Sequence, residues 1–406
     1  MDYLNKAKGI ENEIQNDYLE LHKRAEVGFE LTETVAYVKN RLSELNIEYF
    51  ECGKNGILGY IGDKNASECI LLRADMDALP IKEEAKVGYK SESGAMHACG
   101  HDGHTAMLLG TAKILKQQES ELTGCVKLLF QPAEELLEGA NNMIENGALE
   151  APTVKAAVML HIIVGTELES GCAIISSGGV SAPSADYFRI TVNGSGCHGS
   201  TPEKGRDPLA AVCRIVSALD EIKAKELAVS EKAVITVGKL CSGVAPNVIP
   251  DTATAEGSIR AYNEDTREYI RQRIKNIVKA FSGAFETQGD VDFYVGTPSL
   301  MNDSELSEKI TEWANELLPK GYVKTSEELQ REAKKNGKQS EGAGSEDFAY
   351  ISRKVPSVMI GLASGKCSNG YIYPLHHPEM RLDTASLPYG SALLSKIASE
   401  WIKCRK

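Results

Sequence analysis

Short apolar runs and helix-period segments alternate along the first 165 residues of the chain. Nearly continuous apolar runs are typical of strands buried on both faces, and apolar positions three and four residues apart are typical of helices. The predicted strands are Ile47–Glu51, Ile57–Ile61, Cys69–Ala74, Cys125–Phe130 and Lys155–Leu160, and the predicted helices cover 6–24, Thr32–Leu45, about 104–117 and Asn141–Asn146. Strands that alternate with helices indicate a doubly wound sheet.

The pattern changes after residue 182. Apolar and polar residues alternate over Ser184–Val192, as is typical of a strand with one exposed face. The further elements that we expect here are strands over 233–240, 252–262 and about 291–295 and helices over 208–222 and 265–284. We interpret 183–296 as an α+β domain inserted into a domain that is formed by 1–182 and 297–406.

The first pattern then resumes. We expect a helix over 306–318, an exposed polar stretch over 327–341, a buried strand over 355–362 and a last helix that ends near Cys404. The predicted fold class is therefore α/β, with a doubly wound mixed sheet in the first domain and an inserted α+β domain.

Composition and charge narrow the class of protein. The 406 residues carry a net charge of −12, which argues against a nucleic-acid-binding protein and against binding to an anionic membrane. No apolar run reaches the ~18 residues of a membrane span, and the polar N-terminus has no signal-peptide core. We expect a cytoplasmic protein whose ten cysteines are reduced, with Cys69, Cys125, Cys172 and Cys213 in the core.

One stretch concentrates residues that bind metals. Met96–His104 (MHACGHDGH) holds three of the eight histidines, together with Cys99 and Asp102. Thiolate and imidazole donors gathered in this way suit Zn²⁺, Mn²⁺ or a similar ion. The alternative is a structural or redox-active cysteine beside ordinary surface histidines. The metal hypothesis requires further ligands from other parts of the chain.

Further donors follow the ends of neighbouring predicted strands. Asp77 follows the strand at 69–74, Glu134 and Glu135 follow the strand at 125–130, and His161 ends the strand at 155–160. In an open α/β sheet, ligands bind at the carboxyl ends of the strands. Two metal ions ~3.5–4 Å apart need about this many donors.

Eight stretches resemble, in order, segments of the M20 metallopeptidases. Within that family, the chain is similar to the amidohydrolase subfamily of hippurate hydrolases, aminoacylase-like enzymes and plant auxin-conjugate hydrolases. The stretches are LLRADMDALPI (71–81), MHACGHDGHTAMLLGTAKIL (96–115), LLFQPAEE (128–135), MLH (159–161), GSGCHGSTPEKGRDPL (194–209), APNVIPDTATAEGSIRAY (245–262), GSEDFAY (344–350) and LHHPE (375–379). The resemblance implies two divalent metal ions per subunit, Mn²⁺ or Zn²⁺, and the donor types also admit Co²⁺ or Ni²⁺.

The resemblance implies a role for each matching residue of the first domain. The metal ligands would be Cys99, His101, Glu135, His161 and His376. Glu134 would be the general base for the attacking water, and Asp77 and Asp102 would orient the ligands from behind. We prefer His376 to the adjacent His377, and we expect His97 and His104 to support the site rather than to bind metal.

The inserted domain holds three further candidates. His198 matches the histidine that stabilises the oxyanion of the scissile carbonyl in the family. In relatives this histidine often comes from the partner subunit, so the resemblance implies a homodimer through the inserted domain. Asn247 and Arg260 are candidates for substrate binding. Arg260 would bind a substrate carboxylate through a bidentate fork, or it pairs only within its own sheet.

One segment departs from the family pattern. Relatives usually carry a His-Arg-His-Pro-Glu-like segment near the N-terminus, and this chain has His22-Lys23-Arg24-Ala25-Glu26 instead. The proline and the second histidine are missing. We expect this difference to alter a local turn rather than the chemistry, since no metal ligand lies there.

These observations predict a metal-dependent amidohydrolase. It would hydrolyse the amide bond of an N-acyl amino acid, such as an N-acetyl or N-benzoyl amino acid, and release a carboxylic acid and a free amino acid. A dipeptidase or carboxypeptidase is the alternative within the family. Outside it, the alternatives are an amidase that uses Cys99 as nucleophile and a non-catalytic metal-binding protein.

Overall fold

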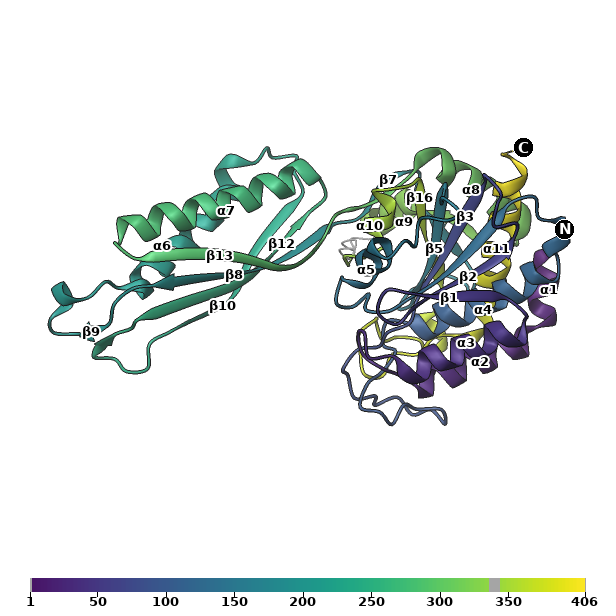
Figure 1. Ribbon diagram of the computed structural model, residues 1–406, viewed down its shortest axis with the longest axis horizontal. Coiled ribbons are helices and arrows are strands. Elements are labelled where there is room, and N and C mark those ends of the chain that lie inside the picture. Colours follow the sequence, from purple (N-terminus) through teal and green to yellow (C-terminus); the bar gives the residue numbers. More distant parts are fainter. Residues whose placement is uncertain (1, 336–343, 406) are drawn as a thin grey trace. The chain divides into compact units, whose positions relative to one another are not determined.

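The computed structural model describes residues 2–335 and 344–405, which form two compact units. Described residues within Met1–Ser181, Met301–Gly342 and Tyr350–Lys406 make up the first unit. Those within Ala182–Leu300 and Ala343–Ala349 make up the second unit. Figure 1 gives the labels of the helices and strands.

In the described residues, the first unit is built on one eight-stranded sheet with the order β1-β2-β4-β3-β5-β16-β6-β15. Its strands are β1 (Glu48–Cys52), β2 (Gly56–Gly62), β3 (Cys69–Asp75), β4 (Cys125–Gln131), β5 (Ala156–Ile163), β6 (Ala173–Ile175), β15 (Val323–Thr325) and β16 (Ser357–Ala363). The neighbours β4, β3, β5 and β16 are parallel, whereas β1–β2, β2–β4 and β16–β6 are antiparallel pairs. This arrangement confirms the predicted mixed sheet.

Helices cover both faces of this sheet. Those outside the segment Ala182–Leu300 are α1 (Tyr3–Gly9), α2 (Glu11–Lys23), α3 (Thr32–Glu44), α4 (His101–Lys116), α5 (Gly139–Glu145), α8 (Ser304–Leu317), α9 (Ser326–Lys335), α10 (Ala349–Ser352) and α11 (Leu387–Lys403). Leu128 of β4 packs in one core with Leu108 of α4. Strand alternation directs Lys127 to the opposite face, where its Nζ donates to the Ala148 carbonyl just beyond α5.

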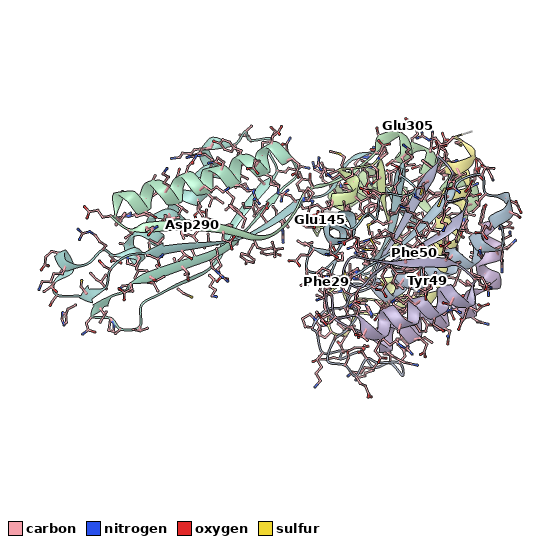
Figure 2. The ribbon with its side chains drawn as sticks, in the orientation of Figure 1. Phe29, Tyr49, Phe50, Glu145, Asp290 and Glu305 are labelled. Atoms are coloured by element: carbon pink, nitrogen blue, oxygen red, sulfur yellow. The ribbon has the colours of Figure 1, made fainter. Side chains whose placement is uncertain are left out.

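The edge strand β1 shows how the sheet ends. Phe50, labelled in Figure 2, is 49% exposed. Its ring centre lies 5.7 Å from that of Tyr60 of β2. Glu48 and Glu51 of β1 pair with Lys64 and Lys39. Charged side chains along an edge strand oppose pairing with another chain.

The helix α4 is buried along most of its length and begins earlier than the sequence indicates. The expected start near residue 104 is wrong, because α4 begins at His101. Gly100 precedes it with φ of 83°, a left-handed conformation that glycine adopts without strain. β5 continues to Ile163, so His161 lies inside the strand and not at its end. The stretch Met96–His104 therefore includes a sharp turn and the first turn of α4.

Three further expectations differ from the structure. The helix expected over 6–24 is divided at Ile10 into α1 and α2. The stretch at 327–341 contributes to a helix, α9, because its Glu and Lys residues are good helix formers; 336–341 lie outside the described residues. Cys213 lies on the helix α6 (Pro208–Glu221) and is exposed, so the prediction that it lies in the core is wrong.

The second unit has its own sheet and core. An antiparallel sheet has the order β10-β12-β8-β13, with the strands β8 (Ser184–Asn193), β10 (Ala233–Ser242), β12 (Thr252–Ala261) and β13 (Gln288–Thr297). The helices α6 (Pro208–Glu221) and α7 (Glu264–Ala284) pack on it through Ile215, Ile274 and their neighbours. The second unit also contains the short pair of β9 (Cys197–His198) with β11 (Val248–Ile249). A further short pair joins β7 (Gly179–Ala182) and β14 (Leu300–Asn302), most of whose residues belong to the first unit. Every helix in the described ranges is too short or too polar to cross a lipid bilayer.

We expect Gly139→Ala to destabilise the protein. A Cβ at this first residue of α5 would overlap the carbonyl oxygen of Pro132, which is a backbone atom that cannot rotate away. Overpacking of this kind costs ~1–3 kcal/mol of unfolding free energy. Thermal denaturation measures the effect. The control is Gly9→Ala, where an added Cβ meets no atom within 4 Å. Equal melting temperatures for the two variants would contradict this expectation.

Candidate metal centre

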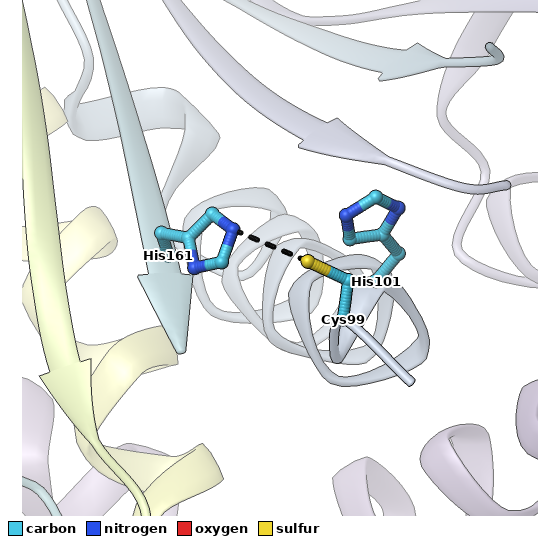
Figure 3. A group of neighbouring side chains, drawn as sticks. All are labelled: Cys99, His101 and His161. Carbon is cyan, nitrogen blue, oxygen red and sulfur yellow. Dashed lines mark hydrogen bonds between the residues drawn. The ribbon is translucent and has the colours of Figure 1, made fainter. Parts of the chain in front are cut away.

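Cys99, His101 and His161 lie together at the carboxyl end of the parallel strands. Figure 3 shows the Cys99 sulfur between the two rings, and Sγ lies 3.8 Å from Nε2 of His161. One potential ligand atom from each of the three residues lies within 4.8 Å of the others. Cys99 precedes α4, His101 begins it, and His161 comes from β5. A turn, a helix and a strand thus direct a thiol and two imidazoles toward one point.

A second group extends this site. Nε2 of His376 lies 3.3 Å from the Cys99 sulfur and 3.5 Å from Oε1 of Glu135. The His376 N–H donates to the Ala98 carbonyl at 2.8 Å, which ties the C-terminal loop to the turn before α4. Ligand atoms of His101, Glu134 and Glu135 form a third group. Because Cys99 and Glu135 each belong to two groups, the groups form one continuous site.

The hydrogen bonds of the His101 and His161 rings leave one nitrogen of each directed toward this site. Nδ1 of His101 donates to the Asp77 carbonyl at 2.9 Å, and Nδ1 of His161 donates to the Ile162 carbonyl at 2.8 Å. A ring that donates through Nδ1 presents a lone pair on Nε2, which is the form that binds a metal. Nε2 of His101 and Oε1 of Glu135 are buried and make no hydrogen bond within the described part of the chain.

Asp77 organises the turn that carries the two glutamates. Its side chain is fully buried, and its two carboxylate oxygens accept the backbone N–H groups of Glu134 at 3.0 Å and of Glu135 at 3.2 Å. Ala133 and Leu137 on either side have φ of 53° and 58°, which is uncommon for residues with a Cβ. The Asp77 carboxylate therefore holds a tight turn, and the backbone carbonyl of Asp77 holds the His101 ring.

Asp75 and His104, which form a further candidate group with His101, are already held by hydrogen bonds to other parts of the chain. Asp75 binds Arg73 through Oδ2 at 2.6 Å and Nδ1 of His104 through Oδ1 at 2.6 Å. Nε2 of His104 accepts the N–H of Ile162 at 2.8 Å. His104 thus fixes the backbone beside His161, in agreement with its expected supporting position. Sequence reasoning did not find Arg73 and Asp75, although two charged residues at the end of an apolar strand were a usable signal.

The electrostatics of the site favour a bound cation. Burial raises the pKa of Glu135 to about 7, with nearby His101 opposing the shift and Asp77 adding to it. Burial also raises the pKa of the Cys99 thiol. Several acidic groups buried together are stable in their charged form only with compensating positive charge, which divalent ions supply.

Asp102 and His377 lie outside the groups that could hold a metal ion. Asp102 accepts the Gly103 N–H at 2.8 Å and binds Nδ1 of His22 at 2.7 Å, outside the metal groups. The ring of His377 stacks on Tyr373, and its Nδ1 accepts the Glu379 N–H at 3.0 Å. This leaves His376, not His377, beside Cys99.

In the second unit, the structure brings two of the three candidates together. His198 pairs with Val248, and the Gly199 N–H donates to the Asn247 carbonyl at 2.7 Å. Nδ1 of the exposed His198 accepts hydrogen bonds from the Ser200 hydroxyl at 2.7 Å and N–H at 3.2 Å, so the ring proton lies on Nε2. Arg260 lies elsewhere, on β12.

The Arg260 guanidinium is held but only partly satisfied. Its NH2 donates to the Tyr187 hydroxyl at 3.0 Å, and the group lies 5.2 Å from the centre of the Tyr187 ring. Its NH1 is buried without a hydrogen-bond partner among the described residues. Thr252 begins β12 three residues after β11, the strand that pairs with His198. Arg260 lies eight positions further along β12, which is about 26 Å at a rise of ~3.3 Å per residue. Arg260 and His198 therefore lie toward opposite ends of the second unit.

This fold, with thiol, imidazole and carboxylate groups gathered at one sheet edge, is typical of a metal-dependent hydrolase. Comparison with known proteins agrees. Residues 71–400 match the Peptidase family M20/M25/M40. The chain is 30% identical over 394 residues to N-acetylcysteine deacetylase of Bacillus subtilis (strain 168), covering 96% of this chain and 97% of that protein.

Two further comparisons cover most of the chain. Hippurate hydrolase of Campylobacter jejuni subsp. jejuni is 36% identical over 319 residues, which are 78% of this chain and 82% of that protein. A crystal structure of a dinuclear metal-binding peptidase of the M20 family from Bacillus subtilis matches with a TM-score of 0.78 at 28% identity, covering 98% of this chain and 99% of that chain. The protein belongs to peptidase family M20/M25/M40, as the resemblance predicted, and it is a hydrolase of amide bonds.

We expect Cys99→Ala to lower the metal content of the purified protein. The Cys99 sulfur is shared by two groups of donors, so its loss weakens both. Elemental analysis after dialysis against metal measures the ratio of metal to protein. The matched control is Cys69→Ala, which removes another buried thiol at the amino end of β3. An unchanged metal ratio in Cys99→Ala would refute the assignment of Cys99 as a ligand.

Proposed function

We propose that this protein hydrolyses the amide bond of N-acyl amino acids, with two divalent metal ions held by Cys99, His101, Glu135, His161 and His376. The observation that carries the proposal is a convergence of potential ligands. Nε2 of His101 and Oε1 of Glu135 are buried, make no hydrogen bond among the described residues, and lie with the Cys99 thiol and the His376 ring. Mn²⁺ or Zn²⁺ suits these donor types, and Co²⁺ or Ni²⁺ is compatible with them. The relatives named as a deacetylase and a hippurate hydrolase support an acyl group on the substrate nitrogen.

Glu134 is the proposed general base. Its side chain is buried, and its Oε2 lies 3.9 Å from Nε2 of His101 without being needed in the set of five ligands. When bound, the metal ions would act as Lewis acids that activate water and polarise the substrate carbonyl. Glu134 would take the proton of the attacking water and return it to the leaving nitrogen. Asp77 would keep Glu134 in place through the backbone N–H groups of the turn.

His198 is the proposed donor to the oxyanion. Its Nε2 carries the ring proton, because Nδ1 accepts the two hydrogen bonds from Ser200. A neutral imidazole N–H directed at the scissile carbonyl oxygen would stabilise the negative charge that develops there. Asn247, the residue before the strand paired with His198, would contact the same part of the substrate. Arg260 would bind the substrate carboxylate through its NH1, which makes no hydrogen bond among the described residues.

The separation of His198 and Arg260 supports a homodimer. One small substrate does not span the roughly 26 Å that separates Arg260 from the other end of β12. We therefore propose that the second unit of a partner subunit supplies His198, while Arg260 acts in its own subunit. In this arrangement the second unit is both the dimer surface and a lid.

The substrate class is tested with N-acyl amino acids and unblocked dipeptides assayed side by side. We expect the metal-loaded protein to hydrolyse N-acetyl or N-benzoyl amino acids more efficiently than dipeptides. We expect Glu134→Gln to retain metal but to lose several orders of magnitude in kcat, because the proton carrier is absent. Glu138→Gln, an exposed glutamate four residues later, is the matched control. Preference for dipeptides would instead establish the dipeptidase alternative, and near-normal turnover of Glu134→Gln would sink the base assignment.

Subunit complementation tests the dimer. His198→Ala and Glu134→Gln are each expected to be inactive when assayed alone. If His198 acts on the partner's site, equal mixing and exchange should restore about a quarter of wild-type activity, since half of the dimers are mixed and each has one competent site. Light scattering of the wild-type protein reports the oligomeric state. A dimer whose mixed variants remain inactive would show that His198 acts within its own subunit.

A further inference from the structure

His22 lies outside the proposed metal ligands and bridges two buried carboxylates. Its Nδ1 is 2.7 Å from Oδ2 of Asp102, and its Nε2 is 3.2 Å from Oε2 of Glu83. The three residues are 4%, 1% and 2% exposed, respectively. A charged cluster buried to this degree needs nearly complete pairing to be stable. The sequence alone predicted that this segment alters only a local turn.

The bridge connects three separate segments of the first unit. His22 is in the last turn of α2, Asp102 is in the first turn of α4, and Glu83 lies in the loop between β3 and α4. Glu83 also accepts the Ser91 N–H at 2.8 Å and so fixes a second point of that loop. Through His22, the helix α2 is bonded to Asp102, the residue that follows His101.

The charges of the cluster favour the protonated ring. Both ring nitrogens face carboxylate oxygens, and only the imidazolium form donates from both. Burial lowers the pKa of His22, but the hydrogen bonds to Asp102 and Glu83 outweigh it and raise the pKa from 6.5 to about 9. The edges of the ring are also packed, with the Tyr18 and Tyr89 ring centres 5.7 and 5.2 Å away. The ring is therefore fixed in both position and charge.

The turn before α4 needs such a constraint. Gly100 and Gly103 stand on either side of His101, and Gly100 adopts φ of 83°. Two glycines give the backbone of this turn more conformational freedom than any other residues would. Asp102 is the residue between them that is bonded to a distant helix. Loss of that bond would let the first turn of α4 move, and Cys99 and His101 would move with it.

We propose that His22 is a positioning residue that holds Cys99 and His101 in the geometry in which they bind metal, by clamping Asp102 against Glu83. The inference rests on the proposed metal centre. Side chains that orient metal ligands from behind typically change metal affinity by about 10–100-fold when they are replaced. His22 would act one residue further back, through Asp102 and the helix turn.

The test measures Co²⁺ binding to the full-length protein and does not rely on activity. We expect His22→Gln to bind Co²⁺ about 10-fold or more weakly in competition with a chromogenic chelator. We also expect the absorption bands of bound Co²⁺ to shift, because they report the geometry of the sulfur and nitrogen ligands. Glu83→Gln, which removes the other carboxylate while keeping the side-chain volume, should change affinity and spectrum in the same direction. If His22→Gln does not fold, Glu83→Gln tests the same positioning role.

The matched control is Asp17→Asn. Asp17 lies on the same helix, is 2% exposed, and binds Tyr37 and Arg41 of α3 and not α4. This variant should lower the melting temperature and leave Co²⁺ affinity and spectrum unchanged. Wild-type affinity and spectrum in both His22→Gln and Glu83→Gln, or an equal change in Asp17→Asn, would overturn the positioning role. A wild-type protein that does not bind Co²⁺ would overturn the proposed metal centre and this inference with it.

Discussion

The first unit depends on the cost of burying many ionisable groups at one edge of a sheet. Carboxylates, imidazoles and a thiol lie there with little access to water, and each needs a partner of matching charge or hydrogen-bonding type. Asp75 and His104 form hydrogen bonds within the chain, whereas Nε2 of His101 and Oε1 of Glu135 form none among the described residues. The difference separates groups that build the site from groups that are available to a ligand.

Hydrogen bonds to the backbone fix the positions of these buried groups. Asp77 accepts two N–H groups of the glutamate turn, His104 accepts the Ile162 N–H, and His376 donates to the Ala98 carbonyl. Each of these bonds joins segments that are far apart in the sequence. The orientation of the donors is therefore set by the ends of β3, β4 and β5 together.

Much of the fold and of the candidate site was predictable from the sequence, because periodicity and motif order carry that information. Apolar runs identified the central strands, and the donors at their ends indicated one site. The start of α4 at His101 was missed, since a left-handed Gly100 leaves no periodic signal. The pairing of His22 with Asp102 joins residues 80 positions apart, and the separation of Arg260 from His198 depends on strand register; neither is encoded locally. The roles of the site residues stay predictions.

The order of strands in the first sheet has a consequence for synthesis on the ribosome. β16 lies between β5 and β6, yet it follows both in the sequence, after the whole second unit has been made. At ~5–20 residues per second, translation from Ile163 to Ser357 takes roughly 10–40 s. The nascent first unit must therefore wait with the flank of β5 uncovered, whereas the core of the second unit lies within the single segment Ala182–Leu300. Chaperone protection would matter most during that interval.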